Sequence, residues 1–203
     1  MQLSDVIFEN PELELPQIEG YWYALQVFGG HEDKARKKIK IHLGEIPVLL
    51  PRRELAIRRG GVVRNEQKPL FPGYLFINLN ERLTYAQGIP LVRETKSTGL
   101  SPTILRMVGL DYGPGKNGDD LIKPVNEDEM QVILYLTREG ELLQLSKVAK
   151  EGSQIRVLSG PLKGIEGIVR SFDHRKKRIK ISIRLFGKEH QVDLGAEQAG
   201  AIV

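Results

Sequence analysis

The 203-residue sequence contains no cysteine, which excludes disulfide bonds and thiolate metal sites. It also lacks any apolar run near the ~20 residues that a membrane-spanning helix needs. No lysine or arginine precedes Lys34, so a secretory signal is not expected. Hydrophobic residues make up 40% of the chain, which is enough for globular cores. We therefore expect a soluble cytoplasmic protein.

Motifs of known catalytic and cofactor sites are missing as well. Gly115-Lys116 lacks both the earlier glycine and the following Ser or Thr of a P-loop. Gly113, Gly115 and Gly118 match G-x-G-x-x-G, but they fall in a loop without the strand and helix of a dinucleotide site. The histidines are scattered, and no metal-ligand spacing occurs. We expect no catalytic residue, no metal site and no cofactor, and hence a binding protein rather than an enzyme.

Charge is unevenly distributed along the chain. Residues 1–20 carry five acids and no base, whereas residues 31–68 carry eleven bases and five acids. Residues 107–145 carry three bases and eight acids, and residues 146–203 carry twelve bases and six acids. Two basic blocks separated by an acidic one predict two surfaces that face polyanions. Ordinary solvated surface is the alternative interpretation.

An α+β domain is predicted over residues 21–138, after an acidic tail at 1–20. Apolar and aromatic runs predict strands, and Ala35, Ile39 and Leu43 recur at helical spacing. Asn126 is the expected N-cap of a last helix, with Glu129 completing a capping box. The expected order is strand 21–28, helix 31–43, strands within 46–57, a Gly-Gly hairpin at 58–64, strand 70–78, helix 82–88, strand 104–108, a loop at 112–118 and a helix up to 138.

A small all-β barrel is predicted over residues 148–203, after a linker at 139–147. The isoleucines at 179, 181 and 183 alternate with polar residues, as in a strand with one buried face. Gly160-Pro161 and Gly187-Lys188 mark turns between short strands. Closing such strands into a barrel removes exposed sheet edges.

The strand within residues 70–78 is apolar on both faces. Tyr74 and Phe76 point to one side, and Leu75 and Ile77 point to the other. Helices of the same domain can cover one side only, so the second side is a candidate partner surface. The alternative is a strand enclosed within its own domain.

Two sets of motifs resemble the two domains of NusG-type transcription elongation factors. The motifs that are similar to the N-terminal domain are Trp22-Tyr23, Phe28-Gly29-Gly30-His31-Glu32, Leu50-Pro51-Arg52-Arg53-Glu54-Leu55 and Leu70-Phe71-Pro72-Gly73-Tyr74. Those that resemble the family's KOW barrel are Gly152-Ser153-Gln154-Ile155-Arg156-Val157, Ser159-Gly160-Pro161, Gly164–Val169, Leu185-Phe186-Gly187 and Val192-Asp193-Leu194. The resemblance covers nearly the whole chain.

The resemblance implies a monomeric factor that travels on RNA polymerase. In this family the N-terminal domain docks an aromatic-rich patch onto the clamp helices of the largest catalytic subunit and suppresses pausing. The matching positions, and hence the expected polymerase-binding residues, are Tyr23, Gln26, Phe71, Tyr74 and Phe76. Core packing is the alternative role for each aromatic residue.

The first basic block adds an expected nucleic-acid contact. Lysine and arginine bind phosphates in a salt-dependent, mostly sequence-neutral way. The nucleic acid is either a nascent RNA hairpin or upstream DNA. The candidate residues are Lys34, Lys37, Lys38, Arg52, Arg53, Arg58, Arg59 and Arg64.

The chain departs from general members of the family in the barrel loop. Those members carry aromatic residues after Gly-Pro, which contact a ribosomal protein or Rho, whereas this loop reads Leu162-Lys163-Gly164-Ile165. The Arg-rich Gly-Gly hairpin resembles that of the specialised LoaP-type paralogs, which are processive antiterminators on selected operons. We predict such an antiterminator, and the alternative is a housekeeping NusG that acts in general elongation, pausing and Rho-dependent termination. The expected barrel contacts, to a ribosomal protein or a Nus-type factor, are Leu162, Ile165, Arg175 and Lys176.

Overall fold

The computed structural model describes residues 13–97, 104–110, 117–151 and 154–199. Most of the predicted 1–20 tail and of the predicted 112–118 loop lies outside these residues. The chain forms two compact units. The N-terminal unit comprises residues 18–50 and 71–125, and the barrel unit comprises residues 51–70 and 126–203 with residues 13–17. Residues 51–70 and 126–138 thus group with the barrel, and the domain bounds inferred from the sequence stay a prediction.

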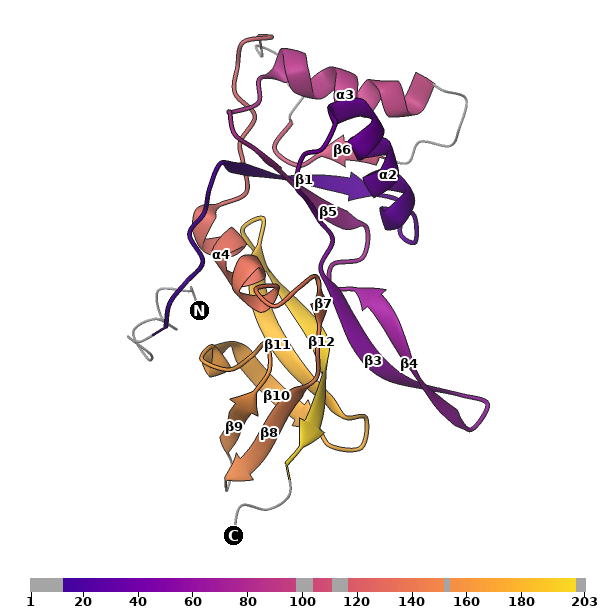
Figure 1. The fold of residues 1–203 in the computed structure, drawn as a ribbon, viewed down its shortest axis with the longest axis vertical. Helices are drawn as coiled ribbons and strands as arrows, with labels where there is room; N and C mark the ends of the chain where they lie inside the picture. Colours follow the sequence, from indigo (N-terminus) through magenta and orange to yellow (C-terminus); the bar gives the residue numbers. More distant parts are fainter. Residues whose placement is uncertain (1–12, 98–103, 111–116, 152–153, 200–203) are drawn as a thin grey trace. The chain divides into compact units, whose positions relative to one another are not determined.

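The N-terminal unit contains one four-stranded sheet and two helices. Figure 1 labels β1, β5, β6, α2 and α3 of this unit. Its strands follow the order β2-β5-β1-β6, and all neighbouring pairs are antiparallel. The strands are β1 (Tyr21–Val27), β2 (Val48–Leu49), β5 (Tyr74–Leu79) and β6 (Ile104–Met107), and the helices are α2 (Glu32–Leu43) and α3 (Tyr85–Ser97). The predicted α+β class is confirmed for this unit.

One face of this sheet forms the core of the unit. Tyr23 pairs with Ile77 and Leu25 pairs with Leu75, so their side chains share that face. They are fully buried in one cluster with Ala35 and other apolar residues. Burying a large aliphatic side chain contributes about 1.5–3 kcal/mol, so this face stabilises the unit. The predicted cover of one strand face is confirmed.

Helix α3 is longer than the predicted helix 82–88. It continues to Ser97 and contains Pro90. Gly88 does not end it: a Cβ at this position would lie 2.3 Å from Cδ1 of Ile122. The glycine therefore permits close approach of the helix to residue 122, and the predicted end of the helix at residue 88 was wrong.

The barrel unit contains a five-stranded sheet in the order β10-β11-β12-β8-β9. Its strands are β8 (Ser146–Glu151), β9 (Gln154–Ser159), β10 (Val169–Asp173), β11 (Arg178–Leu185) and β12 (Lys188–Gln198). In β11 the side chains of Ile179, Ile181 and Ile183 are buried, whereas Lys180 and Arg184 are exposed. The all-β class is confirmed, and the predicted alternation holds except at Ser182, which is 6% exposed.

A long hairpin belongs to the same unit and projects from it in Figure 1. Strand β3 (Arg52–Arg59) pairs antiparallel with β4 (Val62–Pro69), and β7 (Leu142–Leu143) adds to β3 in parallel. Gly60 and Gly61 have φ of 54° and 82°, which a two-residue type I′ turn requires. The hairpin predicted from Gly-Gly is confirmed. The predicted linker 139–147 contains β7 and the start of β8.

Helix α4 (Glu127–Leu136) begins at the predicted cap, because the Asn126 side chain accepts a hydrogen bond from the Asp128 amide. The expected capping box does not form. The carboxylate of Glu129 instead accepts from the backbone N–H groups of Phe186, at 2.8 Å, and Gly187, at 2.9 Å. Glu129 is thus used to hold the β11–β12 turn rather than its own helix end.

Candidate functional sites

The second face of the N-terminal sheet carries four of the residues predicted to dock on polymerase. Phe76 lies opposite Ala24, and Tyr74 lies opposite Gln26, so their side chains share this face. The ring of Phe71 meets that of Phe76 edge-on, at 6.2 Å between centroids and 81° between planes. We call Gln26, Phe71, Tyr74 and Phe76 the Phe76 face.

The Phe76 face has an apolar base and a polar margin. Phe76 is fully buried and Phe71 is 5% exposed, whereas Gln26 and Tyr74 are half-buried. The Gln26 Oε1 atom accepts a hydrogen bond of 2.7 Å from Nε of Arg106, on β6. The sequence did not single out Arg106, because its partner lies 80 residues away. This face of the sheet therefore carries an arginine, an amide and a phenol together with two aromatic rings.

Tyr23 does not join this face. It lies on the helix-covered side of the sheet and is fully buried. Its hydroxyl oxygen accepts from the Leu83 backbone N–H at 2.8 Å. Burial raises the pKa of Tyr23 above its ordinary value, although the Leu83 hydrogen bond opposes the shift. The structure therefore places Tyr23 in the core, where it holds the start of α3.

A buried carboxylate fixes the turn that leads into β5. Gly73 has φ of 80°, and its N–H donates to Oε1 of Glu32 at 2.9 Å. The carbonyl of Gly73 accepts from Val27 N at 2.8 Å. Glu32 is 4% exposed and lies in the first turn of α2. Pro72-Gly73 is therefore bound on both sides, which sets the position of Phe71 next to it.

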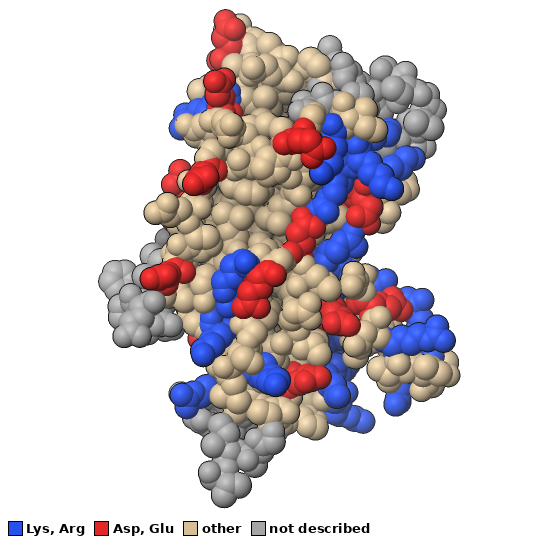
Figure 2. Space-filling model, viewed as in Figure 1, with Lys and Arg blue, Asp and Glu red and all other residues tan. Residues whose placement is uncertain are grey.

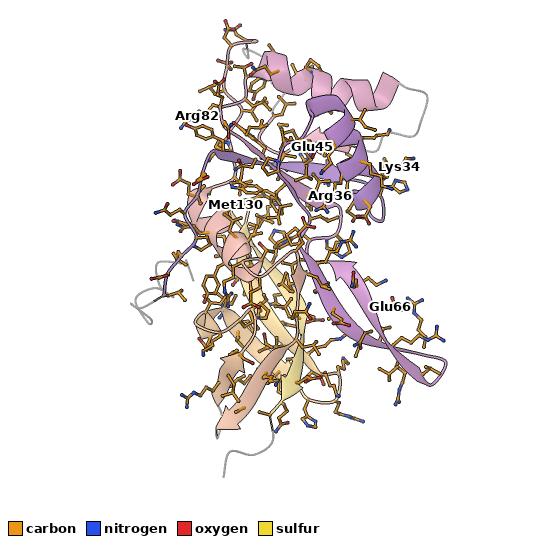
Figure 3. The ribbon with its side chains drawn as sticks, in the orientation of Figure 1. Lys34, Arg36, Glu45, Glu66, Arg82 and Met130 are labelled. Atoms are coloured by element: carbon orange, nitrogen blue, oxygen red, sulfur yellow. The ribbon has the colours of Figure 1, made fainter. Side chains whose placement is uncertain are left out.

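The predicted lysines of α2 differ in exposure. Lys34 and Lys37 are exposed, whereas Lys38 is half-buried. Arg36, which Figure 3 labels beside Lys34, donates through Nη2 to the Val48 carbonyl at 3.1 Å and so ties the helix to β2. Two of the three predicted lysines are thus available to a ligand.

The hairpin exposes three of the predicted arginines, Arg58, Arg59 and Arg64. Arg59 and Lys68 both pair with Glu66, at 3.4 Å and 2.8 Å. The Lys68 hydrogen bond is the main cause of the lowered pKa of Glu66. Figure 2 shows these cations in blue on the projecting hairpin, and Figure 3 labels Glu66 there.

The two remaining predicted arginines lie at the base of the hairpin and are half-buried. The Arg53 guanidinium donates through Nη1 to the carbonyl of Asp193, which joins β3 to β12. Desolvation lowers the pKa of Arg53 despite the nearby Asp193 carboxylate. The Arg52 backbone N–H donates to the Glu141 carbonyl at 2.7 Å. The structure therefore groups Arg58, Arg59 and Arg64, gives Arg53 a structural contact, and leaves the α2 lysines in the other unit.

The barrel loop after Gly160-Pro161 packs its apolar side chains inward and has its backbone hydrogen-bonded within its own unit. Leu162 and Ile165 are fully buried. The Tyr135 hydroxyl donates to the Lys163 carbonyl at 2.7 Å, and Arg138 donates to the Pro161 carbonyl at 3.1 Å. The two predicted apolar contacts therefore pack inside the barrel unit, and the backbone of their loop is already hydrogen-bonded.

Arg175 and Lys176 are exposed in the turn between β10 and β11. The Asp173 Oδ1 atom accepts from the Lys176 backbone N–H at 2.9 Å, and this bond is the main cause of the lowered pKa of Asp173. Lys177 takes a left-handed φ of 52°. The predicted basic turn is confirmed, and its shape is set by one carboxylate.

The chain is similar in sequence to curated NusG proteins. The chain is 29% identical over 187 residues to the transcription termination/antitermination protein NusG of Buchnera aphidicola subsp. Acyrthosiphon pisum, covering 87% of this chain and 93% of that protein. It is 28% identical over 187 residues to the protein of the same name from Escherichia coli K12, with the same coverage. A structure described as "Domain interaction in Thermotoga maritima NusG" matches 86% of this chain and 93% of that chain, with 22% identity and a TM-score of 0.45.

A family model matches more than half of the chain. It covers residues 20–134 and is described as "Transcription termination factor nusG". The matched range contains the N-terminal sheet, α2, α3, the hairpin and most of α4. This chain belongs to the NusG family of transcription factors.

Proposed function

We propose that this chain binds RNA polymerase through the Phe76 face and promotes processive antitermination on selected operons. Membership of the NusG family supports a role in transcription. The observation that carries the finer proposal is the closed barrel loop, in which Leu162 and Ile165 are 0% exposed. The barrel then presents no aromatic side chain at this loop. General members of the family are expected to use such a side chain to contact Rho or a ribosomal protein.

The Phe76 face has the chemistry of a protein interface. Tyrosine and arginine are enriched at the centres of interfaces, where they combine apolar area with hydrogen bonding. Tyr74 is half-buried on the same face as Phe76, and Arg106 is held by Gln26 at 2.7 Å. A partner with apolar side chains and acceptors, such as the clamp helices of the largest polymerase subunit, fits this combination.

The second contact that we propose is with nucleic acid. Arg58 and Arg64 are exposed, and neither forms an ion pair with another residue in the described part of the chain. Such cations gain affinity by releasing counterions from phosphates. A nascent RNA hairpin or upstream DNA beside the polymerase would supply these phosphates.

The proposed mechanism is binding, not catalysis. A factor that prefers the closed, elongating polymerase shifts the population away from the paused state by its differential affinity. A cytoplasmic location belongs to the same proposal. Among the described residues, no helix is long and apolar enough to cross a membrane.

The test is single-round transcription by the cognate polymerase on two templates, one with an intrinsic terminator and one with a Rho-dependent terminator. The proposal predicts increased readthrough at the intrinsic terminator when the full-length protein is added. It also predicts that Rho-dependent termination is not enhanced. Reactions without the protein and without Rho are the controls.

Two results would count against the proposal. Unchanged readthrough, on a template that carries the recruiting sequence of the operon, would refute antitermination. Stronger Rho-dependent termination would favour the housekeeping alternative, because it would show that the barrel couples to Rho despite its closed loop.

A further inference from the structure

The β3–β4 hairpin lies directly against the barrel. The Arg178 Nη2 atom donates to the Ala56 carbonyl at 3.1 Å, and Arg53 donates to the Asp193 carbonyl. A Cβ added at Gly195 would lie 2.6 Å from the Glu54 carbonyl oxygen. Backbone-to-backbone approach at Gly195 and two arginine contacts therefore hold β3 beside β12 and the start of β11.

This contact brings together two basic segments that are far apart in the sequence. Ala56 is three residues before Arg59, which is about 10 Å along an extended strand. Arg178 ends the basic turn that begins at Arg175. Cations separated by about one Debye length act on the same stretch of a polyanion. The hairpin and the turn thus form one cationic surface.

A groove marks the barrel side of this surface. It has a volume of about 160 Å³ and is lined by Ser171, Asp173, Lys176, Arg178, Lys180 and Asp193. Both acids are engaged, Asp173 by the Lys176 amide at 2.9 Å and Asp193 by the Arg178 guanidinium at 3.8 Å. Lys180 is exposed and forms no ion pair with another described residue. The groove therefore offers to a phosphate the exposed ammonium groups of Lys180 and of Lys176, whose Nζ pairs with Asp173 at 3.6 Å.

We infer that this composite surface binds the backbone of a DNA duplex, with the hairpin in the major groove and the barrel turn on the flanking phosphates. The inference rests on the proposed nucleic-acid contact of the hairpin and adds the barrel residues Lys176, Arg178 and Lys180 to it. It assigns the basic turn to DNA rather than to a protein partner. Duplex DNA carries one charge per about 1.7 Å of helix axis with both strands counted, or one per about 3.4 Å on each strand, so about three phosphates of one strand lie along 10 Å of this surface.

The shape of the hairpin favours duplex DNA over other nucleic acids. The B-form major groove, about 12 Å wide, admits a two-stranded ribbon, whereas the major groove of A-form RNA is too narrow and deep. Val62 and Val63, at the tip, are 54% and 53% exposed and offer apolar contact to base edges. Single strands bind by stacking on aromatic rings, and the described hairpin 52–69 contains none.

The test measures fluorescence anisotropy of the full-length protein with a 20-bp DNA duplex, the matching RNA duplex and one DNA strand, over a range of salt concentrations. Three variants are compared: Lys176→Ala/Lys180→Ala in the groove, Arg58→Ala/Arg64→Ala in the hairpin, and Lys188→Ala as control. Lys188 is exposed and lies at the opposite end of β11 and β12 from Arg178.

We expect the DNA duplex to bind most tightly. Each lost phosphate contact lowers affinity roughly tenfold or less near 0.1 M salt and reduces the salt slope by about 1. The affinity of each double variant for the DNA duplex should therefore fall by up to about 100-fold, and the slope of log affinity against log salt concentration should fall by about 2. Lys188→Ala should match the wild type in both quantities.

Different results would overturn different parts of the account. Loss in the hairpin variant alone would leave the proposed hairpin contact and refute the composite surface. Equal or tighter binding of the RNA duplex or the single strand would refute the assignment to duplex DNA. Wild-type affinity in both double variants would refute the proposed nucleic-acid contact itself.

Discussion

In both units a glutamate holds a turn by hydrogen bonds, but the number of bonds differs between the units. In each, a buried glutamate from the first turn of a helix accepts hydrogen bonds from a glycine-containing turn. Glu32 of α2 accepts one, from Gly73, and Glu129 of α4 accepts two, from Phe186 and Gly187. A third carboxylate, Asp173, holds the basic turn at the barrel surface. The contribution of each should follow the number of its bonds and its burial.

An acidic residue at the start of a helix can stabilise a protein in two ways, through the helix dipole and through hydrogen bonds to another segment. Glutamates in a first turn interact favourably with the helix dipole wherever they point. Glu32 and Glu129 are 4% and 8% exposed, so they also supply buried carboxylate acceptors to backbone N–H groups of a turn. Exposed first-turn acids such as Glu127 act only in the first way.

Glu129→Ala should have the largest effect. Two backbone N–H groups lose their hydrogen bonds to a charged acceptor, at about 1.5–3 kcal/mol each, and Phe186 keeps an unfavourable φ of 55°. We expect loss of amide exchange protection over residues 185–190 and about 3 kcal/mol of lost stability in the barrel unit. Glu127→Ala is the matched control and should cost less than about 1 kcal/mol. Equal protection in both variants would contradict the account.

Glu32→Ala should have an intermediate effect, because one bond is lost. Trp22, the single tryptophan of the chain, lies in β1 and reports unfolding of the N-terminal unit by fluorescence. We expect about 1–3 kcal/mol of destabilisation in urea titrations. Glu32→Gln keeps an acceptor oxygen and should cost less. If the two variants unfold alike, the carboxyl oxygen is not what holds Gly73.

The smallest expected effect is the loss of the hydrogen bond between Asp173 and the Lys176 amide when acid protonates the carboxyl. The Lys176 amide lowers the pKa of this carboxyl below its ordinary value of about 3.9, so the bond is fully present above that pH. Its contribution is lost as pH falls through the lowered pKa. We expect the Lys176 amide resonance to titrate below pH 4 without unfolding of the barrel. A midpoint at or above 3.9 would contradict the hydrogen bond.

Local patterns predicted the elements whose determinants are adjacent in sequence. The hairpin follows from Gly60-Gly61, the start of α4 from Asn126, and β11 from alternating isoleucines. The end of α3 was placed too early, at Gly88, because glycine both ends helices and permits close packing, and only the position of Ile122 decides between the two.

The candidate sites were less predictable than the fold. Period-2 alternation places Tyr74 and Phe76 on one face of the sheet. It also separates Tyr23 from Gln26, three residues further along β1, and the pairing of Tyr23 with Ile77 puts Tyr23 on the opposite face. Glu129 and Arg178 act on residues 57 and 122 positions away, so no local pattern reveals them. The distribution of charge along the sequence predicted both basic segments. Their proximity in the fold depends on Gly195 and on the long-range contacts of Arg53 and Arg178.

The most direct test of the central claim is the affinity of the full-length protein for the cognate RNA polymerase core enzyme, compared with Tyr74→Ala and Ile41→Ala. Ile41 is 78% exposed on α2 and controls for loss of exposed apolar surface. The account predicts tight binding of the wild type and of Ile41→Ala. It predicts about 2 kcal/mol, or roughly 30-fold, weaker binding of Tyr74→Ala. Equal affinities of Tyr74→Ala and the wild type would contradict docking through the Phe76 face.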